Sequence, residues 1–108
     1  MNKRLKNFHN KLTLITGAGS GIGRATALKF ADLGARLILC DLNLQALKGT
    51  EELLLKKGNT PILKVLDVSN WQTVTDLAKE IYEEIGAIEI LINNAGVATT
   101  GDFLSTPI

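Results

Sequence analysis

Four short apolar runs recur along the chain, and each has the length and composition of a buried β-strand. They are five to eight residues long, mostly lack an alternation of apolar and polar positions, and are bounded by Gly, Asn, Asp or Pro. We predict parallel strands at residues 12–16, 36–41, 61–67 and 87–94.

The segments between these runs have the spacing of helices. In residues 69–85, apolar side chains recur every three or four positions and form one stripe. Ser69 followed by Gln72 matches a capping box at the start of this helix, and Gly86 provides its stop. Two further helices are predicted at residues 21–33 and 43–57.

This alternation of strands and helices predicts an α/β fold. We expect part of a Rossmann-like, doubly wound parallel sheet, with four strands in the order 3-2-1-4 and three helices. The first two helices should cover one face of the sheet, and the third helix should cover the other. The carboxyl ends of the first and fourth strands would then lie side by side, where ligands bind in such sheets.

The composition is that of one ordinary globular domain. The 108 residues are 45% hydrophobic and 21% charged, with a formal net charge of +1. Residues 1–10 form a basic tail that we expect to be solvated, and residues 11–108 form the folded unit. We expect no nucleic-acid partner, no membrane association and a cytoplasmic location, since no apolar run approaches the ~20 residues of a membrane span. The single cysteine, Cys40, should be a buried strand residue without chemistry.

Candidate chemistry begins with the sequence LITGAGSGIGRA at residues 14–25, which places four glycines directly after the first strand. Backbone N–H groups at the start of a helix hold phosphate groups, and side chains on the turn would keep a diphosphate away from them. The generic pattern G-x-G-x-x-G fails here, because the sixth position from Gly17 is Ile22. The pattern T-G-x-x-x-G-I-G does fit.

That spacing resembles the nucleotide-binding motif of the short-chain dehydrogenase/reductase family. The family transfers hydride between a nicotinamide cofactor and an alcohol or carbonyl carbon. The resemblance implies that the diphosphate of a dinucleotide lies against Gly17, Ser20, Gly21, Ile22 and Gly23.

Three further stretches resemble the same family, each at the end of a later strand. Asp41 ends the second strand, where a carboxylate can accept hydrogen bonds from the adenosine ribose of NAD, and Leu42 follows it. Asp67 and Val68 match an Asp-Val pair that flanks the adenine ring. In the element NNAG, Asn93 would brace the sheet. The resemblance implies cofactor contacts at Asn94, Ala95 and Gly96.

These residues favour NAD over NADP. The carboxylate of Asp41 would repel a 2′-phosphate, and the neighbouring turn positions offer no cation to receive one. Arg24 or the basic N-terminus could still supply that charge, so NADP stays open as the less favoured cofactor.

The family's catalytic Ser and its Y-x-x-x-K pattern are not found in this sequence. The only tyrosine, Tyr82, is followed four positions later by Gly86, so no catalytic residue and no metal ligand are assigned. We therefore expect the cofactor-binding half of an NAD(P)-dependent oxidoreductase, truncated before its catalytic segment and inactive alone. The resemblance implies that the full-length protein acts on a small-molecule alcohol or carbonyl substrate and forms a homo-oligomer.

Two other functions remain open from the sequence. A non-catalytic nucleotide-binding fragment or interaction module would use the same residues without a reaction. A methyltransferase also combines a glycine turn with an acid on the second strand, but that fold gives no account of NNAG.

Overall fold

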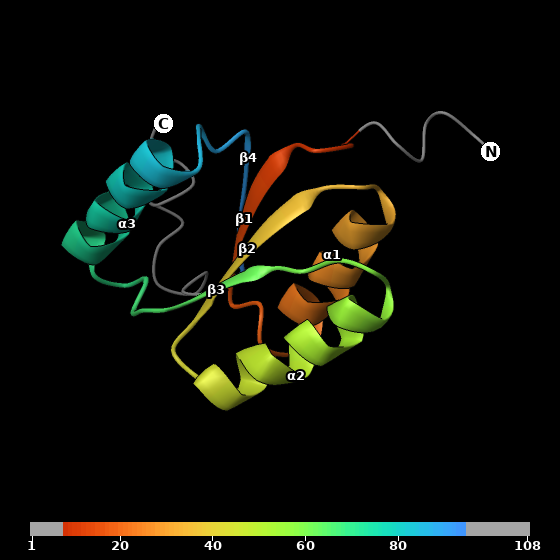
Figure 1. Cartoon of the computed structure of the whole chain (residues 1–108). Coiled ribbons are helices and arrows are strands. Elements are labelled where there is room, and N and C mark those ends of the chain that lie inside the picture. The colour runs from red at the N-terminus through yellow and green to blue at the C-terminus, as the bar shows by residue number, and fades with distance from the viewer. Residues whose placement is uncertain (1–7, 95–108) are drawn as a thin grey trace.

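The chain forms a four-stranded parallel sheet with helices on both faces (Figure 1). The computed structural model describes residues 8–94. The strand order is β3-β2-β1-β4, so the predicted α/β class and strand order are confirmed. Within residues 8–94, no helix has both the length and the apolar character needed to cross a bilayer. The elements are β1 (Leu12–Thr16), α1 (Gly21–Asp32), β2 (Arg36–Asp41), α2 (Leu44–Lys56), β3 (Ile62–Val65), α3 (Trp71–Glu84) and β4 (Ile90–Asn93).

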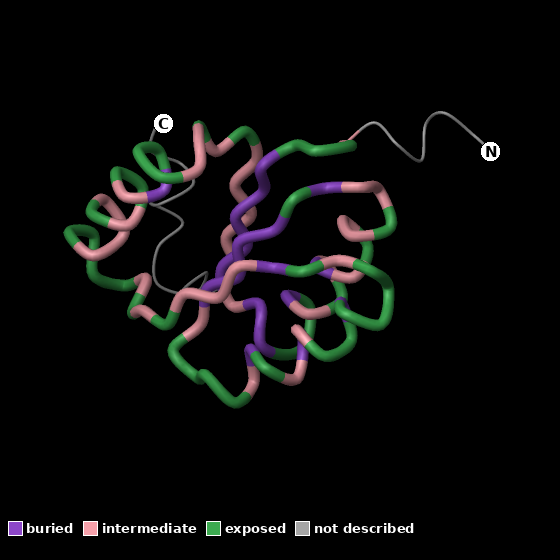
Figure 2. Tube along the Cα trace, in the orientation of Figure 1, coloured by how far each residue is buried: buried purple, intermediate pink, exposed green. Residues whose placement is uncertain are grey.

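The two faces of the sheet carry separate apolar clusters, because successive side chains of a strand point to opposite faces. Ile15 of β1 lies in one cluster with Ala27 of α1 and Leu47 of α2. The adjacent Leu14 lies in the other cluster with Ile81 of α3. Figure 1 shows α1 and α2 together on one side and α3 on the other, as the crossover pattern predicts. In Figure 2, the buried residues are concentrated in β1 and β2, at the centre of the sheet.

The face beneath α3 is less completely filled than the opposite face. Of the residues of α3, all of which the structure describes, Ile81 alone is fully buried. A cavity of about 220 Å³ lies between this helix and the sheet, with Leu14, Leu77 and Leu91 among its lining residues. The predicted apolar stripe therefore faces the sheet, with Ile81 packed in the cluster and the cavity beside it.

Cys40 lies on β2 and also lines this cavity. The side chain is fully buried, as the sequence predicts. Burial raises the pKa of its thiol to about 12. The thiol is therefore protonated at neutral pH and packs as a small apolar group.

Two strands are shorter than predicted. The pairing in β3 covers Ile62–Val65 instead of residues 61–67, and β4 covers Ile90–Asn93 instead of 87–94. The apolar pattern extends past the paired residues because Leu66 and Ile88 pack into the cluster beneath α3 from outside the strands. Hydrophobicity marks burial, and these two residues are partly buried without belonging to a strand.

The predicted cap of the third helix at Ser69 is wrong by one residue. The N-cap is Asn70, whose side chain accepts a hydrogen bond from the N–H of Thr73 at 3.2 Å. The hydroxyl of Ser69 donates instead to the carboxylate of Asp67 at 2.6 Å. A carboxylate accepts a stronger hydrogen bond than a neutral group, so Ser69 turns back toward the loop.

The register brings the carboxyl ends of the strands to one edge of the sheet. Thr16, the last residue of β1, lies opposite Cys40 of β2 and opposite Asn93 of β4. Asp41, the last residue of β2, lies opposite Val65 of β3. The loops that carry the candidate site residues therefore leave the sheet side by side.

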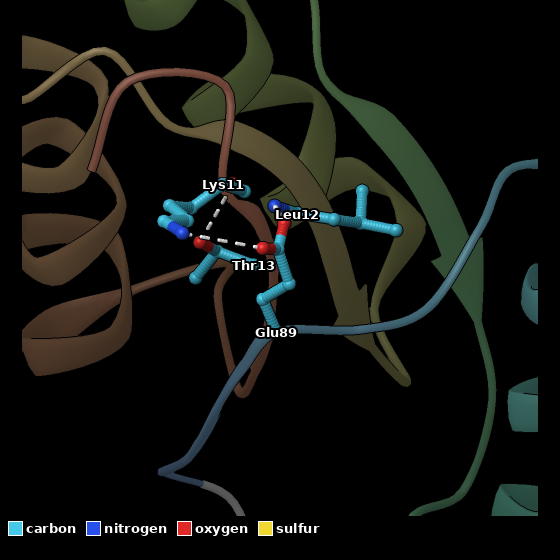
Figure 3. Close-up of polar contacts among 4 residues, drawn as sticks. All are labelled: Lys11, Leu12, Thr13 and Glu89. Carbon is cyan, nitrogen blue, oxygen red and sulfur yellow. Dashed lines mark hydrogen bonds and ion pairs between the residues drawn. The ribbon is translucent and has the colours of Figure 1, made fainter.

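Glu89 fixes the other end of the β1–β4 pair (Figure 3). Its Oε1 accepts the backbone N–H of Leu12 at 3.1 Å, and its own N–H donates to the carbonyl of Leu12 at 2.8 Å. Its Oε2 lies 3.4 Å from Nζ of Lys11, whose carbonyl accepts from the hydroxyl of Thr13. The pKa of Glu89 is lowered, chiefly by the hydrogen bond from Leu12 and to a smaller extent by Lys11.

The acid dependence of stability should report this contact. Because the pKa of Glu89 is lower in the folded chain than its ordinary value of 4.5, ionised Glu89 favours folding above that pH. The contribution is lost as the pH falls through the folded-state pKa. Glu89→Gln keeps an acceptor for Leu12 but removes the titration. At about pH 7, urea unfolding should give the wild type a larger free energy of unfolding than E89Q. This difference should be smaller at about pH 3.5.

Lys11→Met is the matched control for this measurement. It removes the weaker cause of the shift and leaves the hydrogen bond from Leu12 in place. Most of the pH dependence should therefore survive in K11M. A wild-type advantage over E89Q that stays constant across this range would contradict the assignment.

Candidate nucleotide-binding site

The glycine turn between β1 and α1 holds the start of the helix close to the end of the strand. A Cβ added to Gly23 would lie 1.9 Å from the carbonyl oxygen of Gly17, so only glycine fits there. The N-cap residue of α1 is Ser20, whose side chain makes no capping hydrogen bond, and the first turn contains no acidic residue. The backbone N–H groups at the start of α1 are therefore not capped by Ser20, and such a helix start attracts anions.

Asp41, the last residue of β2, lies beside the glycine turn and bonds to it. Its Oδ2 accepts the backbone N–H of Gly19 at 2.9 Å, and its Oδ1 accepts the N–H of Asn43 at 3.1 Å. Asn43 in turn caps α2 by accepting the N–H of Ala46 at 3.0 Å. The carboxylate thus connects the glycine turn to the start of the second helix.

A pocket of about 160 Å³ lies between this carboxylate and the loop after β3. Asp67 stands on its other side and has a lowered pKa, because the hydroxyl and the backbone N–H of Ser69 both donate to it. Both bonds end on Oδ1, which leaves Oδ2 without a hydrogen-bond partner among the described residues. The pocket is lined by Gly17, Asp41, Leu42, Leu66, Asp67, Val68 and Ser69.

The end of β4 is bonded to β1 through Thr16. The hydroxyl of Thr16 donates to Oδ1 of Asn93 at 2.6 Å and accepts the backbone N–H of Asn94 at 3.0 Å. Asn93 therefore bonds across the sheet, as its predicted bracing role requires. The side-chain nitrogen Nδ2 of Asn94 is buried without a partner among residues 8–94. A buried amide N–H₂ without a partner is costly, so this atom is suited to an acceptor on a ligand.

The structure brings most of the predicted site residues to one edge of the sheet. Ser20, Gly21 and Ile22 are exposed at the start of α1, whereas Gly23 is buried against Gly17. Ala95 and Gly96 lie outside the described residues. Five of the predicted residues line the pocket itself: Gly17, Asp41, Leu42, Asp67 and Val68.

Sequence reasoning missed Thr50 of α2, which is fully buried and bonded to the glycine turn. It shares the buried face of α2 with Leu47 and Leu54, and a threonine on an apolar stripe could have indicated a polar contact. Arg24, which the sequence left open as a partner for a 2′-phosphate, is bonded to Thr50 and to two backbone carbonyls. No group of three or more His, Cys, Asp or Glu side chains within residues 8–94 could hold a metal ion.

Comparison with known proteins identifies the family of the chain. The sequence profile described as "short chain dehydrogenase" matches residues 11–107. The chain belongs to the short-chain dehydrogenase/reductase family. Epidermal retinol dehydrogenase 2 of Mus musculus is 42% identical over 108 residues, a match that covers 99% of this chain and 35% of that protein. Estradiol 17-beta-dehydrogenase 11 of Mus musculus is 40% identical over 104 residues, covering 96% of this chain and 35% of that protein.

Solved structures of the family have the same arrangement of elements. A short-chain dehydrogenase/reductase from Burkholderia phymatum in complex with NAD superposes with a TM-score of 0.71 and 43% identity, covering 78% of this chain and 30% of that one. Hydroxysteroid dehydrogenase from Escherichia coli gives a TM-score of 0.76 at 29% identity, covering 85% and 38%. The chain spans about a third of the length of the curated relatives it matches.

The close approach at Gly23 can be tested by a pair of alanine variants. Gly23→Ala would place a methyl group 1.9 Å from a backbone oxygen, so the turn must open, and we expect a loss of roughly 2–3 kcal/mol in the free energy of unfolding. Gly21→Ala meets no atom within 4 Å but holds a φ of +56°, so it should cost only about 1 kcal/mol. Urea unfolding measures both. Equal losses would show that the approach of Gly17 does not restrict position 23.

Proposed function

We propose that this chain binds NAD and forms the cofactor-binding part of an NAD(P)-dependent oxidoreductase of the short-chain dehydrogenase/reductase family. One observation carries the proposal: a glycine turn and two carboxylates, from the ends of three neighbouring strands, line one pocket. The relative from Burkholderia phymatum, solved in complex with NAD, supports NAD as the ligand.

The residues present fit the parts of a dinucleotide. The N–H groups at the start of α1, which the side chain of Ser20 does not cap, suit the diphosphate, and the missing side chain at Gly23 lets α1 begin against Gly17. Asp41 suits the adenosine ribose, whereas Asp67 and Val68 suit the adenine ring, whose amino group can donate to Oδ2 of Asp67. The buried Nδ2 of Asn94 offers a donor on the side of β4. NAD bound in this way supplies the hydride acceptor of the reaction.

NAD is proposed over NADP because of the charges around the ribose position. Asp41 places a carboxylate at the pocket wall, where it would repel a 2′-phosphate. Arg24, one candidate cation, is already bonded to three neutral acceptors of the turn and of α2. A phosphate would have to compete with those bonds.

An alcohol or carbonyl compound is the proposed substrate of the whole protein. Two relatives are named for dehydrogenation of estradiol and of retinol, both of which are alcohols. Tyr82 is 69% exposed on α3 and is followed by Gly86 at the place where Y-x-x-x-K needs lysine. We therefore propose that the 108 residues bind the dinucleotide and that the reaction needs residues they do not contain.

Titration of the purified chain with NADH tests the binding function directly. We expect saturable enhancement of NADH fluorescence and competition by ADP, because both ligands share the diphosphate and the adenosine. S-adenosylmethionine is the control ligand for the methyltransferase alternative and should compete much more weakly than ADP, because it carries adenosine but lacks the diphosphate. A chain that binds S-adenosylmethionine in preference to NADH, or neither ligand, would overturn the proposal.

Cofactor preference can be tested with two acidic residues of the same pocket. Asp41→Asn removes the charge that opposes a 2′-phosphate, so the ratio of NADPH to NADH affinity should rise by about fivefold or more, which corresponds to ~1 kcal/mol for one close charge pair. Asp67→Asn is the matched control, since it faces the proposed adenine and should weaken both cofactors alike. Equal ratios in the wild type and both variants would show that Asp41 does not determine the preference.

A further inference from the structure

Arg24 of α1 makes an unusual set of contacts for a cation beside an acidic pocket. Its Nε donates to the hydroxyl of Thr50 at 2.9 Å, and its Nη2 donates to the carbonyls of Gly19 at 2.7 Å and Ala46 at 3.1 Å. All three acceptors are neutral, and none of the ion pairs among the described residues includes Arg24. The guanidinium group therefore joins the glycine turn to α2.

Thr50 completes the same connection from within α2. Its side chain is fully buried, accepts the Nε–H of Arg24, and donates its hydroxyl proton to the carbonyl of Ala18 at 2.7 Å. The alternative acceptor, the carbonyl of Ala46, lies farther away at 3.5 Å. Two consecutive carbonyls of the turn, those of Ala18 and Gly19, are thus held from one side by Thr50 and Arg24.

Because a peptide unit is planar, these bonds to the carbonyls also orient the N–H groups of the same peptide units. In a trans peptide the C=O and the following N–H point in opposite directions, and no cis peptide occurs among the described residues. Holding the carbonyls of Ala18 and Gly19 toward α2 therefore directs the N–H groups of Gly19 and Ser20 away from it. The N–H of Gly19 indeed donates to Asp41, which lines the pocket.

We propose that Arg24 and Thr50 are positioning residues for the dinucleotide: they set the two peptide planes of the turn so that the N–H of Ser20 points at the diphosphate. The inference rests on the proposed NAD site and adds residues that lie outside it. Neither side chain needs to touch the cofactor, since both act through the backbone of residues 18–20. Through the same bonds, the charged guanidinium group of Arg24 has a structural role.

Gly49 supports this assignment from α2. A Cβ added to Gly49 would lie 2.6 Å from Nη2 of Arg24. That atom is the end of a flexible side chain, so Gly49→Ala would displace the guanidinium group without breaking the helix. Alanine also favours a helix interior by about 1 kcal/mol over glycine. The substitution therefore separates the position of Arg24 from the stability of α2.

Binding and melting measurements on the full 108-residue chain test the inference with four variants. Thr50→Val keeps the shape of the side chain and removes the hydroxyl, whereas Thr50→Ser keeps the hydroxyl. We expect NADH and ADP to bind about tenfold more weakly to T50V and within about twofold of wild type to T50S, as the loss of one well-aligned hydrogen bond implies. Gly49→Ala should weaken both ligands about fivefold with an unchanged or higher Tm. Lys48→Ala, a neighbouring exposed position of α2, should bind like the wild type.

Adenosine, which lacks the diphosphate, is the probe that separates positioning from general damage. Its affinity should be the same in all variants, because Arg24 and Thr50 orient only the diphosphate donors. Wild-type affinity for ADP in both T50V and G49A would overturn the inference and leave the NAD site standing. Loss of adenosine together with ADP would also overturn it, since that result indicates a collapsed site. A wild-type chain that binds neither NADH nor ADP would refute the NAD site and this inference together.

Discussion

The contact between Gly23 and the carbonyl of Gly17 sets the direction in which α1 leaves the sheet. Because the helix starts against the end of β1, its next turn places Ala27 in the core beside Ile15 and Leu39. The same start aims Arg24 at α2, and the side chain of Ser20 does not cap the first N–H groups of the helix. Core packing, the polar link between two helices and the position of the N-terminus of α1 all depend on one position that can hold no side chain.

Much of this arrangement could be predicted from the sequence, because hydrophobic periodicity reports burial and burial follows the order of elements. The strand order and the distribution of helices over the two faces followed from the alternation of β and α segments. The ends of β3 and β4 could not be placed, since Leu66 and Ile88 pack against the cluster beneath α3 without belonging to a strand. The cap at Asn70 was missed because Ser69 also fits the pattern, and the competing carboxylate of Asp67 only becomes decisive once the loop has its shape.

The candidate site could likewise be predicted only in part from the sequence. The clustering of Asp41, Asp67 and Asn93 could be predicted because each lies at or just after the carboxyl end of a strand, and these ends meet at one edge of a parallel sheet. The contacts of Thr50 and Arg24 could not be predicted, since their hydrogen bond joins residues 26 positions apart and depends on how α1 and α2 pack. Motifs fix which groups approach a ligand. The side chains that orient those groups emerge only from the packing of helices.

The buried thiol of Cys40 makes this chain convenient for chemical labelling. It is the single cysteine of the sequence, it lies in a central strand, and its raised pKa keeps it in the unreactive thiol form at neutral pH. A cysteine introduced at an exposed position would therefore react with maleimides while Cys40 stays protected. Conversely, alkylation of Cys40 requires the centre of the sheet to open, so its rate follows the opening of the core under native conditions.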